Sequence, residues 1–220
     1  SPAWSPDSRQ LFYSGTGFQL HRQTLGDLAA VEDIGTGYQI TLTPDGGTMM
    51  TTRSETGNDF DLFYKSVSDD GDWVKLFDAP ATQLAPRVSP DGRHVVYGSD
   101  ETGTNEVYLR EFPSGGGLWQ VSVDGGFWPR WSDDGERIFF VDEDTIYEVD
   151  FDPGPPMRLG RPLEVVDREP LGWSLMFGWP PGFDVSADGE RFLVCQPVAQ
   201  DETAEGIIVV ESWLAEVEGR

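Results

Sequence analysis

Short apolar runs, each introduced by the same kind of tight turn, recur along the chain. In each turn a Ser or Thr is followed two residues later by Asp, and in four of the five Gly comes next. Pro presets the first corner of such a turn, Asp bonds nearby backbone, and Gly accepts a positive φ. The turns are Ser5–Ser8, Thr43–Gly46, Ser89–Gly92, Ser132–Gly135 and Ser186–Gly189, with aspartates 38, 46, 43 and 54 residues apart. The pattern therefore predicts five equivalent β-hairpins.

The residues after each turn predict strands that are covered on both faces. They are mostly β-branched and aromatic, and their apolar positions run together instead of alternating. Further strands are predicted at 61–64, 106–109 and 145–148, and weaker ones at 73–77 and 118–121. Each repeat is then a four-stranded antiparallel meander, and a period in the forties is typical of a β-propeller.

The predicted fold class is all-β, a β-propeller of four-stranded antiparallel blades with five repeats visible. Five blades account for nearly all 220 residues, although the chain could also be part of a ring of six or more blades. The predicted blades are 1–37, 38–83, 84–126, 127–178 and 179–220.

Charge and composition narrow the range of partners. The chain has 15 basic and 39 acidic side chains and a net charge of −24, which argues against nucleic acid as a partner. A solvated acidic surface without a partner is the simpler interpretation of this charge. No run of about 20 apolar residues is present, so no membrane insertion is predicted. The lone Cys195 is interpreted as a buried, inert thiol.

The repeated Ser-Pro-Asp-Gly turn, its apolar strand and the Gly-Asn or Thr-Asn loop before the next strand resemble TolB-type propeller repeats. Residues 183–193 and 207–217 further resemble the ending of propellers fused behind bacterial serine/threonine kinases and some regulators, except that Ser212 replaces the usual Asn. The resemblance implies a catalytic or DNA-binding domain upstream and an extracytoplasmic location. The sequence has no glycine-rich phosphate loop, no His-Arg-Asp catalytic loop and no Asp-Phe-Gly motif, so no kinase chemistry is assigned to it. A partial ring would expose a blade edge and allow self-association.

One candidate site follows from aligning the five turns. The residue two positions before each turn is predicted to face the central channel, and there the chain has Ala3, Thr41, Arg87, Arg130 and Asp184. Two arginines and an aspartate could bind a small acidic ligand or an acidic side chain of a protein. The alternative is that the arginines pair with acidic neighbours and hold blades together.

Tryptophans form the second candidate site. Trp128 and Trp131 lie near the fourth turn, and Trp173 and Trp179 lie in a Gly- and Pro-rich insertion at 172–182. Such residues can stack on sugars or fill a partner's pocket, or they can pack between blades.

Signals for catalysis and metal binding are weak. His21 and His94 lie in different strand contexts, and 69–72 is better explained as a hairpin turn than as a calcium loop. No metal or cofactor is predicted. The sequence favours a non-catalytic, ligand- or protein-binding sensor module. The alternative is a propeller enzyme of the lyase or glycoside-hydrolase type that acts on acidic sugars at the channel mouth.

Overall fold

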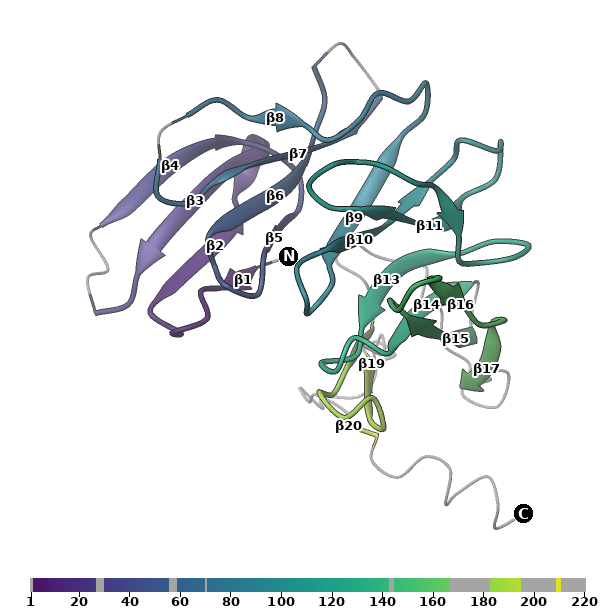
Figure 1. The fold of residues 1–220 in the computed structure, drawn as a ribbon. Helices are drawn as coiled ribbons and strands as arrows, with labels where there is room; N and C mark the ends of the chain where they lie inside the picture. The colour runs from purple at the N-terminus through teal and green to yellow at the C-terminus, as the bar shows by residue number, and fades with distance from the viewer. Residues whose placement is uncertain are drawn as a thin grey trace, which may run out of the picture. The chain divides into compact units, whose positions relative to one another are not determined.

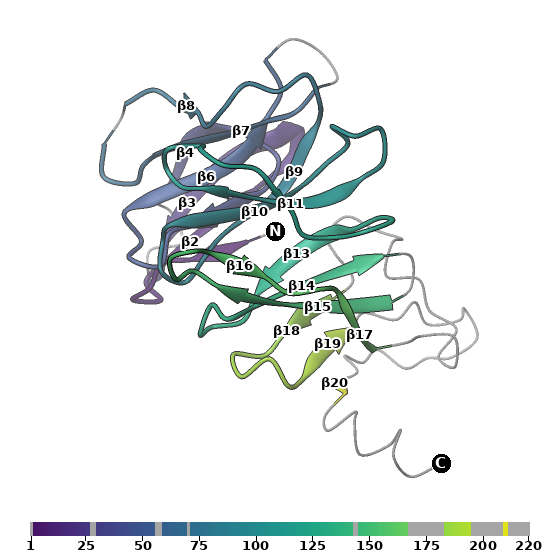
Figure 2. The same ribbon diagram turned by 45° about the vertical axis from the view of Figure 1, so that its right-hand side comes forward.

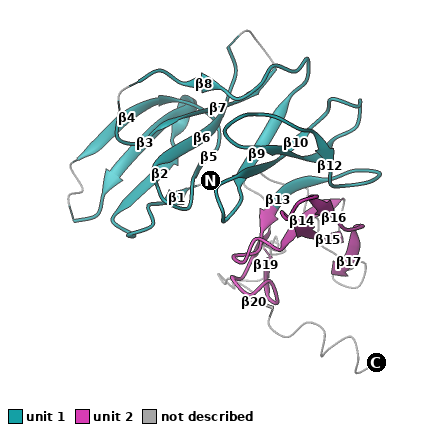
Figure 3. Cartoon of the chain, in the orientation of Figure 1, with its two compact units in different colours: residues 1–129 teal, residues 130–220 magenta. Residues whose placement is uncertain are grey.

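The computed structural model describes residues 2–26, 30–55, 59–69, 71–142, 145–166, 183–194 and 209–210. The chain divides into two compact units, residues 1–129 and residues 130–220 (Figure 3), and each is described by itself. Strands dominate both units, and within the described residues the helical structure is a single 3₁₀ turn, η1 (Thr16–Phe18). The all-β prediction is confirmed.

Residues 1–129 contain three four-stranded antiparallel sheets in which consecutive strands are neighbours (Figures 1 and 2). The first sheet consists of β1 (Ala3–Trp4), β2 (Gln10–Ser14), β3 (Gln19–Thr24) and β4 (Val31–Thr36). The second consists of β5 (Ile40–Leu42), β6 (Thr48–Arg53), β7 (Asp61–Ser66) and β8 (Val74–Lys75). The third consists of β9 (Gln83–Val88), β10 (His94–Ser99), β11 (Glu106–Glu111) and β12 (Trp119–Gln120). All three have the predicted meander topology.

The remaining strands form two further sheets. The fourth sheet begins with β13 (Phe127–Trp131), which crosses the division between the units, and continues with β14 (Arg137–Asp142), β15 (Thr145–Asp152) and β16 (Arg158–Leu159). It has a fifth strand, β17 (Leu163–Val166), which also pairs with β15. The last sheet consists of β18 (Phe183–Val185), β19 (Phe192–Val194) and β20 (Val209–Val210).

The five turns are the same structure. In the fourth, the Ser132 hydroxyl donates to Asp134 Oδ1 at 2.5 Å, the Glu136 amide donates to the same oxygen at 2.9 Å, and the Arg137 amide donates to Ser132 Oγ at 3.0 Å. The other four turns repeat these three bonds. The fourth turn residue has a positive φ in every copy, including Ser8 at 56°. The predicted equivalence of the turns is confirmed at atomic level.

The same hydrogen bonds lower the pKa of the turn aspartates. For Asp134 the largest cause is the Ser132 hydroxyl, followed by the Glu136 amide. A carboxyl whose pKa is depressed on folding contributes stability above its unfolded pKa of about 4, and that contribution is lost as the pH falls through the folded value.

Ser132→Ala removes this hydroxyl without changing the net charge, so general charge repulsion cancels in a comparison with the wild type. We expect the variant to lose about 1–2 kcal/mol at pH 7, because Asp134 loses its hydroxyl donor and the Arg137 amide loses its acceptor. The difference should shrink as the pH falls from 5 to 3, and urea denaturation at several pH values measures it. Ser68→Ala, whose hydroxyl contacts only Ser66 in the described chain, is the control and should show no pH-dependent difference. A pH-independent loss in Ser132→Ala would contradict the assignment.

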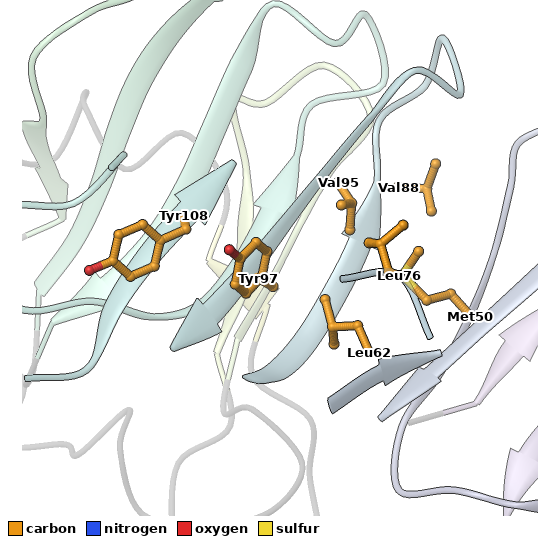
Figure 4. Close-up of a cluster of buried hydrophobic side chains, with 7 residues drawn as sticks. All are labelled: Met50, Leu62, Leu76, Val88, Val95, Tyr97 and Tyr108. Carbon is orange, nitrogen blue, oxygen red and sulfur yellow. The ribbon is translucent and has the colours of Figure 1, made fainter. Parts of the chain in front are cut away.

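Strand β6 explains why the apolar positions do not alternate. Met49 and Met50 are adjacent, both are buried, and on a strand they point to opposite faces. Met49 packs with Phe12 and Leu20 of the first sheet, whereas Met50 packs with Val95 and Tyr97 of the third (Figure 4). The second sheet therefore lies between two hydrophobic cores, and both faces of its strands are covered as predicted.

Candidate functional site

A cavity of about 430 Å³ lies in residues 1–129, among the connections between strands of the first two sheets. The Ser-Pro-Asp turns join the first and second strands of each sheet, so in a meander the β2–β3, β4–β5 and β6–β7 connections gather at the opposite end. Each of these three connections contributes residues to the cavity. Its volume is typical of a small-molecule site.

Three aromatic rings line the cavity. Phe18 and Tyr38 have ring centroids 4.9 Å apart, and Tyr38 and Phe60 have centroids 5.7 Å apart, with interplanar angles of 37° and 58°. Phe18 is 53% exposed and has a φ of 62°, in the left-handed region that few side chains adopt. The local backbone therefore holds a large apolar ring at the surface of the cavity.

Arg53 and Thr52, at the end of β6, also line the cavity. The Arg53 guanidinium carbon lies 5.2 Å from the ring centroid of Phe63 and 5.4 Å from that of Trp73. Burial lowers the pKa of Arg53, and the nearby Glu55 opposes this shift. Thr52 is buried, and its hydroxyl has no hydrogen-bond partner in the described part of the chain.

Gly37 allows the close approach that shapes the cavity. A Cβ at this position would lie 2.3 Å from Thr51 Oγ1 and 2.9 Å from Leu20 Cδ1. The Gly37 amide donates to the Phe18 carbonyl, and the neighbouring Tyr38 amide donates to the Thr52 carbonyl, at 2.8 and 2.7 Å. These bonds fix the β4–β5 connection against both of its neighbours.

A second cavity, of about 630 Å³, lies in residues 130–220 beside β14 and β15. Three of its charged side chains, those of Arg137, Asp152 and Arg158, engage one another or nearby residues. Arg137 contacts Glu148 at 3.5 Å and donates to the Asp188 carbonyl at 2.6 Å, and Arg158 lies 4.0 Å from Asp152. Its lining has one aromatic residue, Phe151, where that of the first cavity has three.

The structure brings together two of the residues predicted to face the channel. Arg130 Nε lies 3.1 Å from Asp184 Oδ1, and the Arg130 side chain is 11% exposed while that of Asp184 is 66% exposed. Burial lowers the pKa of Arg130, and the charge of Asp184 opposes this. Arg87 belongs to residues 1–129, where its guanidinium donates to the Pro86 carbonyl at 2.9 Å.

The tryptophans occupy different settings. Trp128 is buried and has a φ of 55°, and Trp131 packs edge-to-face on Phe151 at 5.2 Å. Trp131 and Phe151 belong to the same sheet, so this contact lies within the fourth sheet. Trp173, Trp179 and the insertion at 172–182 lie outside the described residues, as does Cys195.

Comparison with solved structures identifies the fold. TolB from Acinetobacter baumannii matches 88% of the chain with 18% identity and a TM-score of 0.62, and the Cps50 (Swd1) β-propeller domain from Myceliophteria thermophila matches 96% with 12% identity and a TM-score of 0.67. The chain therefore has a β-propeller fold, similar to those of TolB and the Swd1 domain. It spans 47% of the TolB chain and 72% of the Swd1 domain.

A structure of an enzyme matches as well. A prolyl endopeptidase structure aligns with 88% of this chain over 31% of its own length, with 11% identity and a TM-score of 0.53. No family model and no curated protein matches the sequence. The similarity therefore establishes the propeller fold, and the function has to be argued from the site.

The sequence prediction missed the residues that line the cavity of this propeller. Phe18, Tyr38 and Phe60 lie in connections at the same end of their sheets, and the meander topology together with their aromatic character could have revealed them. Within the described residues no group of three His, Cys, Asp or Glu side chains could hold a metal ion. Likewise, no described helix has the length and apolar character to cross a membrane.

Proposed function

We propose that this propeller is a non-catalytic binding module that takes up a small ligand, or a projecting group of a protein partner, in the cavity between its first two sheets. The observation that carries the proposal is the aromatic wall of Phe18, Tyr38 and Phe60 beside Arg53. Rings held at the edge of a cavity provide contact area at low entropic cost, and a single cation gives orientation.

The sensor role within a larger protein belongs to the same proposal. Its support is the resemblance of residues 183–193 and 207–217 to the ending of kinase- and regulator-fused propellers, most of which lies outside the described residues. An extracytoplasmic location is proposed on the resemblance to TolB-type repeats.

A small-molecule screen by thermal shift, followed by ¹H–¹⁵N NMR, tests the binding proposal. We expect ligands that shift the amide signals of Phe18, Tyr38 and Arg53 and are recovered chemically unchanged. Phe18→Ala should lower the affinity for these ligands about tenfold or more by removing one ring of the aromatic wall. Leu25→Ala, equally exposed at 53% but just beyond the other end of β3, should leave affinity unchanged. Ligands that map elsewhere would overturn the cavity as the site, and turnover of a ligand would favour the enzyme alternative.

A further inference from the structure

We propose that the cavity between the first two sheets recognises a small aromatic carboxylate, with the ring on the Phe18–Tyr38–Phe60 wall and the carboxylate on Arg53. This inference rests on the proposed binding function and adds the chemical class of the ligand.

Arg53 is kept available in a chain that is rich in acid. Its cross-strand neighbour on β7 is Asp61, the carboxylate that would ordinarily pair with it. Lys75 occupies that carboxylate instead, with Nζ 2.9 Å from Asp61 Oδ2, and it also lies 3.9 Å from Glu55 and 3.6 Å from Asp78. Among the described residues Arg53 contacts aromatic rings and forms no ion pair. The Arg53 guanidinium therefore remains able to bind an anion in the cavity.

The setting of Arg53 favours a carboxylate over a more highly charged group. The rings of Phe63 and Trp73 remove water from the guanidinium, which strengthens a charge-assisted hydrogen bond formed there. The planar guanidinium matches the two oxygens of a carboxylate. The net charge of −24 repels a dianion such as a phosphate ester more strongly than a monoanion.

The aromatic wall determines the other half of the ligand. The rings of Phe18, Tyr38 and Phe60 are tilted successively, so the wall is curved and offers both faces and edges. A flat ring can stack on one member and meet the edge of the next, the arrangements that aromatic pairs prefer. The cavity volume of about 430 Å³ accommodates one such molecule.

Three probes separate the contributions of charge and ring. Indole-3-acetate carries both, indole-3-acetamide has the same ring without the charge, and butyrate has the charge without the ring. We expect indole-3-acetate to bind at least about tenfold more tightly than either of the others, measured by NMR titration of the full chain. Arg53→Gln should abolish the preference for the acid over the amide, whereas Phe18→Ala should weaken both indoles.

Arg9→Gln is the matched control, because it removes the same charge from an exposed site on the first turn and should leave the acid preference intact. Melting temperatures of all variants exclude unfolding as the cause of lost binding. Equal affinity for acid and amide would overturn the carboxylate assignment while leaving the binding module in place. Failure of all three probes would overturn the ligand class, and the separate screen would then decide whether the cavity binds anything.

Discussion

Phe139→Ala is expected to destabilise residues 130–220 by about 3–5 kcal/mol, the usual cost of removing a fully buried aromatic ring. Phe139 lies in the middle of β14 and has no exposed surface. Its ring meets that of Phe192 on β19 edge-to-face, with centroids 5.6 Å apart and planes at 76°. The cavity left behind would lie between the fourth and fifth sheets, at the contact of Phe139 with Phe192. Urea denaturation measures the loss.

The control is Leu163→Ala on β17, because Leu163 is exposed and its truncation should change stability by less than about 0.5 kcal/mol. Phe192→Ala and the double variant complete a cycle that isolates the contact between the sheets. A coupling of about 0.5–1.5 kcal/mol is expected for an aromatic pair in this geometry. Strictly additive losses would mean that the two sheets do not stack through these rings.

Much of the fold could be predicted because its strongest signal is local. The three hydrogen bonds of each turn involve residues at most five positions apart, such as Ser132 and Arg137. A local network of this kind requires the same residue types at the same spacing, so it can be recognised in the sequence wherever it occurs. The same holds for Met49 and Met50, where two adjacent buried residues mark a strand that is covered on both sides.

The extra strand of the fourth sheet could not be predicted in this way. β15 is eight residues long, and its outer side offers two pairing segments. Phe151 and Asp152 pair with β16, whereas Ile146 to Glu148 pair with β17. The length of β15 determines which short segments can pair with its outer edge. The repeat pattern carries no information on this length.

The cavity was missed for a related reason. Phe18, Tyr38 and Phe60 are about twenty residues apart and meet only because consecutive sheets place their connections side by side. Arg53 remains available because Lys75 forms the ion pair with Asp61. This competition between side chains of different strands leaves no pattern in the sequence. Alignment of the turns instead drew attention to the inner strands, where Arg130 and Asp184 contact each other.

Asp184→Ala distinguishes the two interpretations of that inner-strand pair. If the pair is structural, its loss leaves the buried Arg130 guanidinium without this carboxylate, and we expect a destabilisation of about 1–3 kcal/mol. The figure is below that for a fully buried pair because Asp184 is largely exposed and screened by solvent. Thermal and urea denaturation of residues 130–220 in the intact chain provide the measurement. Unchanged stability would contradict a structural role and favour the interpretation of the pair as a ligand site.

Arg130→Met is the complementary variant, since it removes the buried charge but keeps an apolar side chain of similar length. A structural pair predicts an asymmetry, with Arg130→Met costing less than Asp184→Ala, because only Asp184→Ala keeps the buried Arg130 charge while removing the Asp184 carboxylate. Arg87→Met changes the same repeat position in residues 1–129 and controls for removing an arginine there. If the pair is instead a ligand site, Arg130→Met should abolish binding of a small acidic probe such as acetate. The melting temperatures of both variants should then equal that of the wild type.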